Sequence, residues 1–435
     1  LSKEVREQTE ELMRGSRPAT TVCSSSLELG IDIGSVKSVG QIGAPWSVSS
    51  LVQRLGRSGR REGEPSIMRV YIAIDRPDSR SGLVDRLYPD LLQAIALTEL
   101  MLQKWIEPPE IHGLDLSTCM QQVLSVLAET GGVTPEQLHD ALVTRGAFRQ
   151  VDSNLLYDLL ACMSTADLIE VMPDEGQLIL GLAGQKIVSH YQFYSAFATP
   201  EEYRVTCDGS LIGLLPALFL PAERDHVILA ARRWEVVGLD HDRSEIQVRP
   251  ARSRKPPKFL GADGDIHPRV RQKMREVLVS DTPIRYLNDD GAEMLREARA
   301  AARAAALGQR GILPTGDASC LWFTWTGTVI QRTLMAMAKA LDLDAQDRGI
   351  AIEFQHSADE VRDRLRHLSA NPPAAVTLAA HVPTRFIRKY DLYLSPELLN
   401  RQLAESLLDV PGALDVASTV ICRTDRIPGE GGPHE

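Results

Sequence analysis

The sequence lacks the features that mark membrane, secreted and zinc-binding proteins. No stretch approaches the ~18 consecutive apolar residues of a membrane span. The sequence begins at Leu1, with neither an initiator methionine nor a leader in which an apolar run follows positive charges. Six cysteines are scattered without a C-x-x-C pair. They predict reduced, mostly buried thiols and neither a metal site nor a disulfide framework. We therefore expect a cytoplasmic protein without membrane contact, whose sequence starts inside a longer chain.

Composition sets the broad class of the protein. Hydrophobic residues make up 43% and charged residues 24%, which is ordinary for globular chains and excludes wholesale disorder. A chain of 435 residues exceeds one compact core, so two to four domains are expected. The net charge of −10 argues against a basic coat protein for nucleic acid, but local basic grooves remain compatible with it.

The pattern along the chain predicts a multidomain α/β and α+β protein. Strand, helix and strand alternate at the start, with strands at Ala19–Ser24, Val39–Ile42 and Val70–Ile74 and a helix capped by Ser47. This order predicts parallel βαβ units that hold ligands at the carboxyl ends of their strands. The predicted parts are 1–76 (partial α/β domain), 77–110 (one linker helix over 83–110), 111–186 (three helices and a β-hairpin), 187–425 (barrel-like β-rich part, then helices) and 426–435 (disordered tail). The third part has the order of a winged helix, and a small helical spacer is the alternative.

Two motifs lie close together in the first part. Residues 23–34 read CSSSLELGIDIG after a predicted strand, and residues 53–61 read QRLGRSGRR at the end of a predicted helix. Together, and separated by one strand and one helix, they resemble motifs V and VI of superfamily 2 helicases. The alternative is that the acidic residue caps a turn and the arginines form surface ion pairs.

The residue types of both motifs suit a nucleotide and a nucleic acid. Arg57 and Arg60 lie three positions apart, on one side of a turn, and the permanent charge and planar fork of arginine suit a γ-phosphate. Gly56 and Gly59 would leave room for phosphate. Asp32 is placed to accept a hydrogen bond from a ribose hydroxyl, with Gly30 allowing close passage. Ser24 and Ser25 would donate to a nucleic-acid phosphate, and the motif VI resemblance adds Gln53 to the nucleotide site.

The resemblance narrows to the Lhr-type (large helicase-related) branch of that superfamily. It rests on LSKEVR at residues 1–6, SSLELGIDIG at 25–34 and YSAFATPEEYRV at 194–205. It is specific over 1–61, moderate over 186–262 and loose beyond. It implies a second RecA-like domain, a winged helix and a β-rich domain. The implied activity is ATP-dependent 3′-to-5′ translocation and unwinding of single-stranded DNA or DNA–RNA hybrids in genome maintenance.

Half of the nucleotide site in the family pattern is missing from this sequence. The sequence contains no G-x-x-x-x-G-K-[S/T] loop and no D-E-x-H, which would bind the phosphates and Mg²⁺. We expect these motifs in a first RecA-like domain that precedes Leu1 and completes the ATP and Mg²⁺ site. Alone, the chain is expected to bind nucleic acid without ATP turnover. A non-catalytic nucleic-acid or partner-binding module derived from a helicase is the alternative.

A basic segment and three tryptophans are the remaining candidates for nucleic-acid binding or for core packing. Residues 249–276 hold nine basic and three acidic side chains, a net of +6. A strand-tracking groove is predicted from cations beside an aromatic ring, namely Arg252, Arg254, Lys255, Lys258 and Phe259. A solvated loop with the phenylalanine in the core is the alternative, and relatives tend to have tryptophan there. Strand alternation predicts a buried Trp234 and at most one buried side chain among Trp322 and Trp325.

Overall fold

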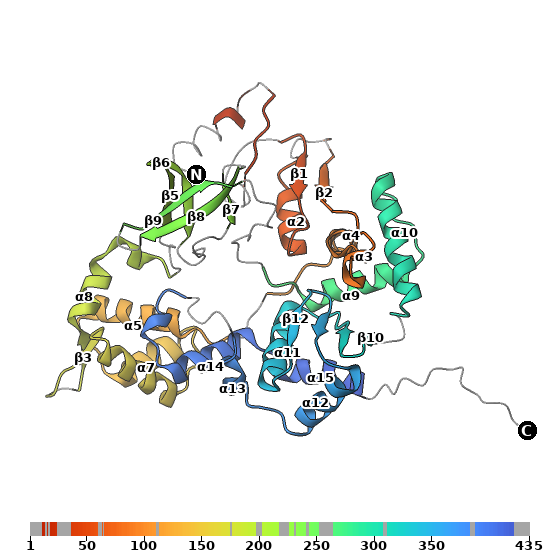
Figure 1. The fold of residues 1–435 in the computed structure, drawn as a ribbon. Coiled ribbons are helices and arrows are strands. Elements are labelled where there is room, and N and C mark those ends of the chain that lie inside the picture. Colours follow the sequence, from red (N-terminus) through yellow and green to blue (C-terminus); the bar gives the residue numbers. More distant parts are fainter. Residues whose placement is uncertain are drawn as a thin grey trace, which may run out of the picture. The chain divides into compact units, whose positions relative to one another are not determined.

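The computed structural model shows a mixed α/β protein (Figure 1). It describes residues 11–13, 15, 18–23, 36–59, 63, 65–109, 113–174, 176–196, 202–216, 226–229, 232–240, 243–251, 264–307, 311–382 and 388–421. The chain forms two compact units. Unit 1 contains 1–114, 264–385 and 396–435, and unit 2 contains 115–263 and 386–395. The domain boundaries expected from the sequence are not tested by this division and stay a prediction.

Unit 1 begins with the predicted strand–helix–strand arrangement. Strands β1 (Val39–Ile42) and β2 (Met68–Tyr71) pair in parallel, with Val39 opposite Met68, and helix α2 (Val48–Leu55) connects them (Figure 1). The strand expected at Ala19–Ser24 is wrong over residues 19–23, which pair with no strand in the described part of the chain. The βαβ unit is confirmed.

The long helix expected over 83–110 is wrong, because the chain breaks in its middle. Helix α3 (Leu83–Arg86) stops before Tyr88, which adopts a left-handed φ of 51°, and α4 starts at the next residue (Pro89–Leu102). Proline has no N–H for a continuing helix and disfavours the helical region for the preceding residue. Helix α4 is buried on most of its surface, which makes it the central helix of unit 1.

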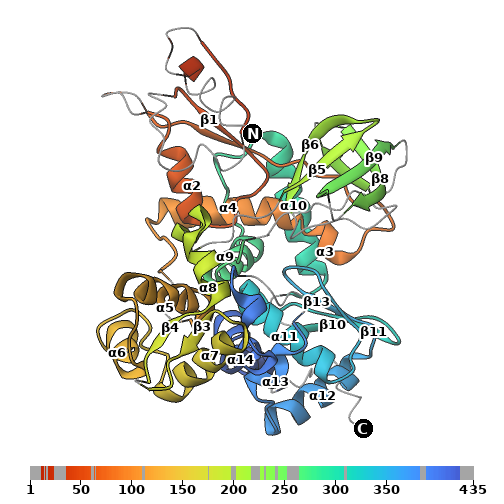
Figure 2. The same cartoon turned by 90° about the vertical axis from the view of Figure 1, so that its left-hand side faces the viewer.

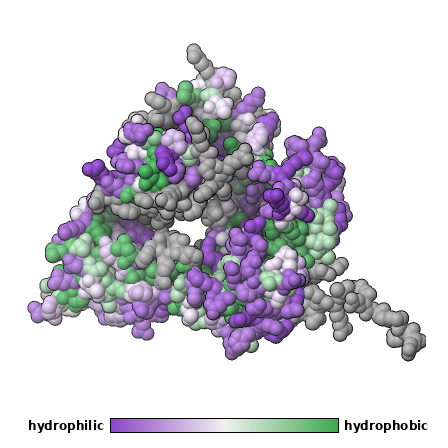
Figure 3. Space-filling view, in the orientation of Figure 1, coloured by the Kyte–Doolittle hydropathy of each residue, from purple (hydrophilic) through white to green (hydrophobic). Residues whose placement is uncertain are grey.

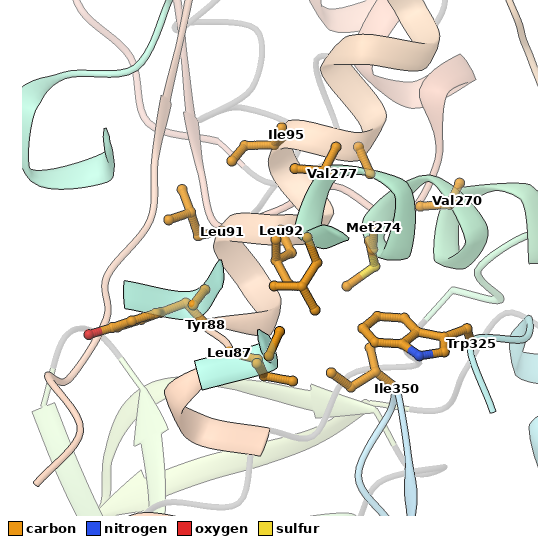
Figure 4. Packing of buried hydrophobic residues seen from close by; sticks show 14 of the residues in the cluster. Leu87, Tyr88, Leu91, Leu92, Ile95, Val270, Met274, Val277, Trp325 and Ile350 are labelled. Atoms are coloured by element: carbon orange, nitrogen blue, oxygen red, sulfur yellow. The ribbon is translucent and has the colours of Figure 1, made fainter. Parts of the chain in front are cut away.

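The core of unit 1 lies between α4 and α9 (Pro268–Val279). Leu92 of α4 and Met274 of α9 point toward Trp325 and Ile350 in Figure 4, and all four are buried. Helix α10 (Asp289–Ala304) packs against α9, and its outward side is hydrophilic in Figure 3. The packing joins residues from both ends of unit 1 into one core.

A four-stranded antiparallel sheet and further helices complete unit 1 (Figure 2). The strand order is β10 (Ile312–Gly316), β11 (Ser319–Trp322), β13 (Ile352–Phe354) and β12 (Ala345–Asp347). The helices are α11 (Thr328–Ala340), α12 (Ala358–Ala370), α13 (Ala375–Ala379), α14 (Pro396–Leu407) and α15 (Val410–Ile421).

Both tryptophans near this sheet are buried, with exposed fractions of 1% for Trp322 and 6% for Trp325. The expectation of at most one buried side chain is therefore wrong. Strand β11 ends at Trp322, and Trp325 takes a left-handed φ of 50°, so strand alternation does not reach it.

Unit 2 starts with the predicted helices and hairpin. The elements are α5 (Leu116–Thr130), α6 (Pro135–His139), a π-helical turn (Asp140–Thr144), α7 (Ser153–Thr165), β3 (Ile169–Val171), β4 (Leu178–Leu180) and α8 (Leu182–Ser189). Thr134 and Gln137 form a capping box at the start of α6, and Asp152 caps α7. Gly131 ends α5 with a left-handed φ of 80°, which suits a residue without a side chain.

A five-stranded sheet follows a 3₁₀ turn at Tyr191–Tyr194. Its order is β6 (Ser210–Pro216), β5 (Glu202–Cys207), β9 (Glu245–Pro250), β8 (Arg232–Asp240) and β7 (His226–Leu229). Trp234 is buried beside Val236, as predicted. The sheet is open among the described strands, with β6 and β7 as its edges, so it forms no closed barrel there.

A short segment late in the chain also belongs to unit 2. The backbone N–H of Tyr390 donates to Ser117 Oγ at 2.9 Å, and Arg388 pairs with Asp115 at 3.4 Å. Lys389 Nζ donates to the carbonyl oxygens of Gln192 at 2.6 Å and Ser195 at 2.8 Å. This segment therefore fixes both the start of α5 and the turn that follows α8.

Candidate nucleotide site and nucleic-acid interface

The helix that carries motif VI is anchored at its amino end by two side chains. Ser47 Oγ accepts the N–H of Ser50 at 3.1 Å, as a predicted cap does. Glu107 adds a second cap, since its two carboxylate oxygens accept the N–H groups of Val48 at 2.7 Å and Ser49 at 3.0 Å. These N–H groups have no partner inside the helix, and a negative charge there also meets the positive end of the helix dipole. The start of α2 is thereby fixed.

Arg54 anchors the last turn of the same helix. Its Nη1 donates to Gln41 Oε1 on β1, and Gln41 Nε2 donates to the carbonyls of Ile42 at 3.0 Å and Gly43 at 3.2 Å. The first arginine of the motif is therefore used to join α2 to the end of the strand. Gln53, the neighbouring candidate, is exposed, and Arg57 is half-buried just beyond the helix.

The loop after the helix is closed by Ser58 and Gly59. Ser58 is buried, with its Oγ 3.0 Å from Leu55 O and 3.2 Å from Ile67 O, and this Oγ accepts the N–H of Ile67 at 3.0 Å. Gly59 has a φ of 66°, and a Cβ there would lie 2.5 Å from the backbone nitrogen of Ser66. The packing of the loop against residues 66–67 therefore demands glycine at position 59, independently of any phosphate.

Most of the predicted site lies outside the described residues. These positions are Ser24, Ser25, Gly30, Asp32, Arg60, Arg252, Arg254, Lys255, Lys258 and Phe259. Of the nucleotide-site candidates, Gln53 and Arg57 are described, and both lie at the carboxyl end of α2. The roles assigned to the other positions stay predictions.

The basic character of 249–276 is reduced by its own structure. Arg249 pairs with Glu235 through Nη2 at 2.8 Å and Nε at 3.2 Å. Arg271 and Lys273 are each 8% exposed within unit 1, and Lys273 pairs with Glu276 at 2.6 Å. These two side chains count toward the net +6 of the segment, but burial removes them from the reach of a phosphate.

The described residues contain neither a metal-binding cluster nor a membrane-spanning helix. No group of three or more His, Cys, Asp or Glu side chains could hold a metal ion there. In the same ranges, no helix is long and apolar enough to span a membrane.

Sequence reasoning missed the residues that hold the motif VI helix in place. Glu107 lies 59 positions from the helix start, and Gln93 lies 48 positions from Pro45, to whose carbonyl oxygen its Nε2 donates at 2.9 Å. Local spacing carries no signal for contacts at such separations. The helix cap Ser47 was found because its partner is three residues away.

Comparisons with known proteins identify helicase relatives of this chain. Residues 1–62 match the helicase conserved C-terminal domain family. An ATP-dependent helicase Lhr-Core of Methanocaldococcus jannaschii is 39% identical over 128 residues, which are 26% of this chain and 15% of that protein. An Lhr helicase/probable uracil glycosylase of Mycolicibacterium smegmatis is 50% identical over 66 residues, 15% of this chain and 4% of that protein. The matched regions thus span a small part of these relatives.

The fold has a solved counterpart. The structure of Mycobacterium smegmatis helicase Lhr bound to ssDNA and AMP-PNP aligns with a TM-score of 0.57 and 19% identity, over 97% of this chain and 58% of that chain. The likeness therefore extends beyond the motifs to the arrangement of the elements. The chain is thus similar to Lhr-type superfamily 2 helicases, in sequence over the matched regions and in its fold.

Proposed function

We propose that the chain supplies the second RecA-like half of the nucleotide site, and nucleic-acid-binding parts, of an ATP-dependent 3′-to-5′ helicase. The carrying observation is the position of Arg57. It follows a helix that Ser47 and Glu107 anchor at one end and Arg54 anchors at the other. An arginine on such a rigid support suits catalysis, because its charge must meet the phosphoryl oxygens in a fixed geometry.

The residue types fit a nucleoside triphosphate. Arg57 offers a permanent charge and a planar fork of donors, and Gln53, four positions earlier, offers an exposed amide. We assign Arg60 to the same phosphate end, and Asp32 with Gly30 to the ribose. ATP, when bound, supplies the phosphoryl group whose hydrolysis drives movement. The Mg²⁺ ligands and the phosphate loop are assigned to a first RecA-like domain, since this sequence holds neither motif.

Single-stranded DNA or a DNA–RNA hybrid is the proposed partner. Ser24 and Ser25 are assigned to its phosphates, and the cations of 252–258 with Phe259 to a strand-tracking surface. The three helices and hairpin of unit 2 are interpreted as a winged helix, and the five-stranded sheet as part of a barrel-like domain. A role in genome maintenance and a cytoplasmic location belong to the same proposal.

The test compares two arginines of one motif in the helicase that contains both motor domains. We expect Arg57→Ala to lower DNA-stimulated phosphate release by on the order of 10³-fold, with little change in melting temperature. Arg54→Ala should lower the melting temperature, since it removes the bond to Gln41, and should lower all activities together. Equal losses of stability and turnover in both variants would contradict the assignment of Arg57 to catalysis.

The chain on its own provides a second readout. Without the phosphate loop it should release no phosphate above background, with or without single-stranded DNA. Robust DNA-stimulated turnover by the chain alone would refute the division of the site. If the helicase with both motor domains also hydrolyses no ATP, the non-catalytic binding module replaces the proposed function.

A further inference from the structure

A buried hydrogen-bonded link connects α9 with the loop that leads into the motif VI helix. Gln93 on α4 is 6% exposed and lies between the two. Its Nε2 donates to Pro45 O at 2.9 Å, and its Oε1 accepts Arg271 Nη1 at 3.3 Å. Pro45 stands two residues before Ser47, the cap of α2. The amide of Gln93 is therefore hydrogen-bonded to α9 on one side and to Pro45, in the loop that leads into α2, on the other. This loop is called the entrance of α2.

Arg271 is an unusual residue for this place. It is 8% exposed, its Nε has no partner, and its Nη1 contacts the Met274 sulfur at 3.4 Å besides Gln93. Burial lowers its pKa to about 10, although Asp347 and Asp90 act in the opposite direction. Among the described residues it forms no ion pair. A buried charge without a carboxylate partner destabilises a fold, so stability does not explain it.

Asp347 adds an electrostatic interaction with the arginine. Asp347 Oδ1, whose charge acts on Arg271, accepts Gln331 Nε2 at 3.0 Å and the N–H of Gly349 at 2.7 Å. Gln331 is itself buried and accepts Thr324 Oγ1 at 2.7 Å. Asp347 is itself exposed and acts on Arg271 through its charge, whereas Gln331 holds its carboxylate from a buried position. All of these groups belong to unit 1.

We propose that Gln93 and Arg271 are positioning residues that hold the entrance of α2 and thereby set the place of Arg57 in the nucleotide site. The inference rests on the proposed function and deepens it. Gln93 can serve this role only as an amide, because it must donate to a carbonyl and accept from a guanidinium at once. The arginine orients the amide by occupying its oxygen, which leaves the NH₂ group facing Pro45.

The decisive variants separate stability from position in the helicase with both motor domains. Arg271→Met removes a buried unpaired charge with similar volume, so the melting temperature should stay equal or rise. Gln93→Glu gives Arg271 a carboxylate but removes the donor to Pro45. We expect both variants to lower the kcat of DNA-stimulated ATP hydrolysis about tenfold to a hundredfold, with KM for ATP changed less than threefold. Amide hydrogen exchange over 45–50 should become faster.

Two controls make the outcome unambiguous. Arg303→Met on α10 breaks an exposed ion pair with Asp281 and should leave kcat unchanged. Arg271→Lys keeps a donor for Gln93 Oε1 and should recover part of kcat. If kcat follows melting temperature across the variants, or stays at the wild-type value in Arg271→Met and Gln93→Glu, the positioning role is refuted while Arg57 remains assigned. If the wild-type helicase hydrolyses no ATP, the proposed function itself fails.

Discussion

Position 59 shows how a motif glycine can serve the fold as well as the ligand. The sequence motif suggests that Gly59 makes room for phosphate, whereas the loop geometry already requires it. Its φ of 66° suits glycine, and the backbone of Ser66 occupies the space of a Cβ. Ser66 Oγ in turn donates to Ser58 O at 3.0 Å, which closes the loop behind Arg57. Loss of the glycine would therefore move the candidate catalytic residue.

Gly59→Ala is predicted to destabilise the protein more than Gly63→Ala. Both positions have positive φ, 66° and 84°, so the backbone strain of about 1–2 kcal/mol is shared. Only at position 59 would the added Cβ lie 2.5 Å from the Ser66 nitrogen, while at position 63 no atom of the described residues lies within 4 Å of it. Urea unfolding of the two variants measures the difference. Equal losses would mean that the loop relaxes around the methyl group.

Helix α2 illustrates which features of a helix can be predicted from the sequence. Its predicted start at Ser47 is a local signal and is confirmed. The capping box of α6 and the end of α5 at Gly131 are local signals of the same kind. Glu107 is not a local signal, because its position beside α2 depends on where α4 ends. The break between α3 and α4 also has a local signal, namely Pro89. The helical spacing of the apolar residues on both sides of this proline nevertheless predicts one continuous helix. Strand alternation does not predict the burial of Trp325, because β11 ends at Trp322.

The same difference between local signals and tertiary contacts decides which residues of the candidate site can be predicted from the sequence. Arg57 and Gln53 could be found from the motif, since motif spacing is local. Gln41, Gln93 and Arg271, which hold the helix, could not be found, because each contact depends on tertiary packing. The net charge of 249–276 likewise counts Arg271 although this side chain is buried, because a charge count carries no information on burial.

Glu107→Ala is predicted to lower the free energy of unfolding by about 1–2 kcal/mol, as loss of a helix cap does. Glu107→Gln should lose less, because one amide oxygen still accepts from Val48 or Ser49. Ser47→Ala is the matched control at the same helix end. Chemical denaturation measures all three. An unchanged stability in Glu107→Ala would show that water replaces the carboxylate.

At the scale of the whole molecule, nucleic-acid binding is predicted to be weak and strongly dependent on salt. Each phosphate contact contributes a slope of roughly −0.7 in log affinity against log salt for single strands. Replacing Arg252, Arg254 and Lys255 together by Ala should flatten this slope. Arg249→Gln is the matched control, since Glu235 already holds that guanidinium. A slope near zero for the unmodified chain, or equal slopes for the two variants, would contradict the predicted surface.

The segment 388–395 carries a consequence for the order in which the protein can be made. It completes unit 2 by bonding to Ser117 and Gln192, yet the chain passes through 264–385 of unit 1 before reaching it. A ribosome releases residues one after another, so the first turn of α5 waits for partners that are synthesised long after the rest of unit 2. Neither unit can therefore finish folding as an independent early product of translation. Cutting the chain before Arg388 would leave Asp115 and Ser117 without these partners, and excising unit 2 as one continuous piece would remove the contacts that close it.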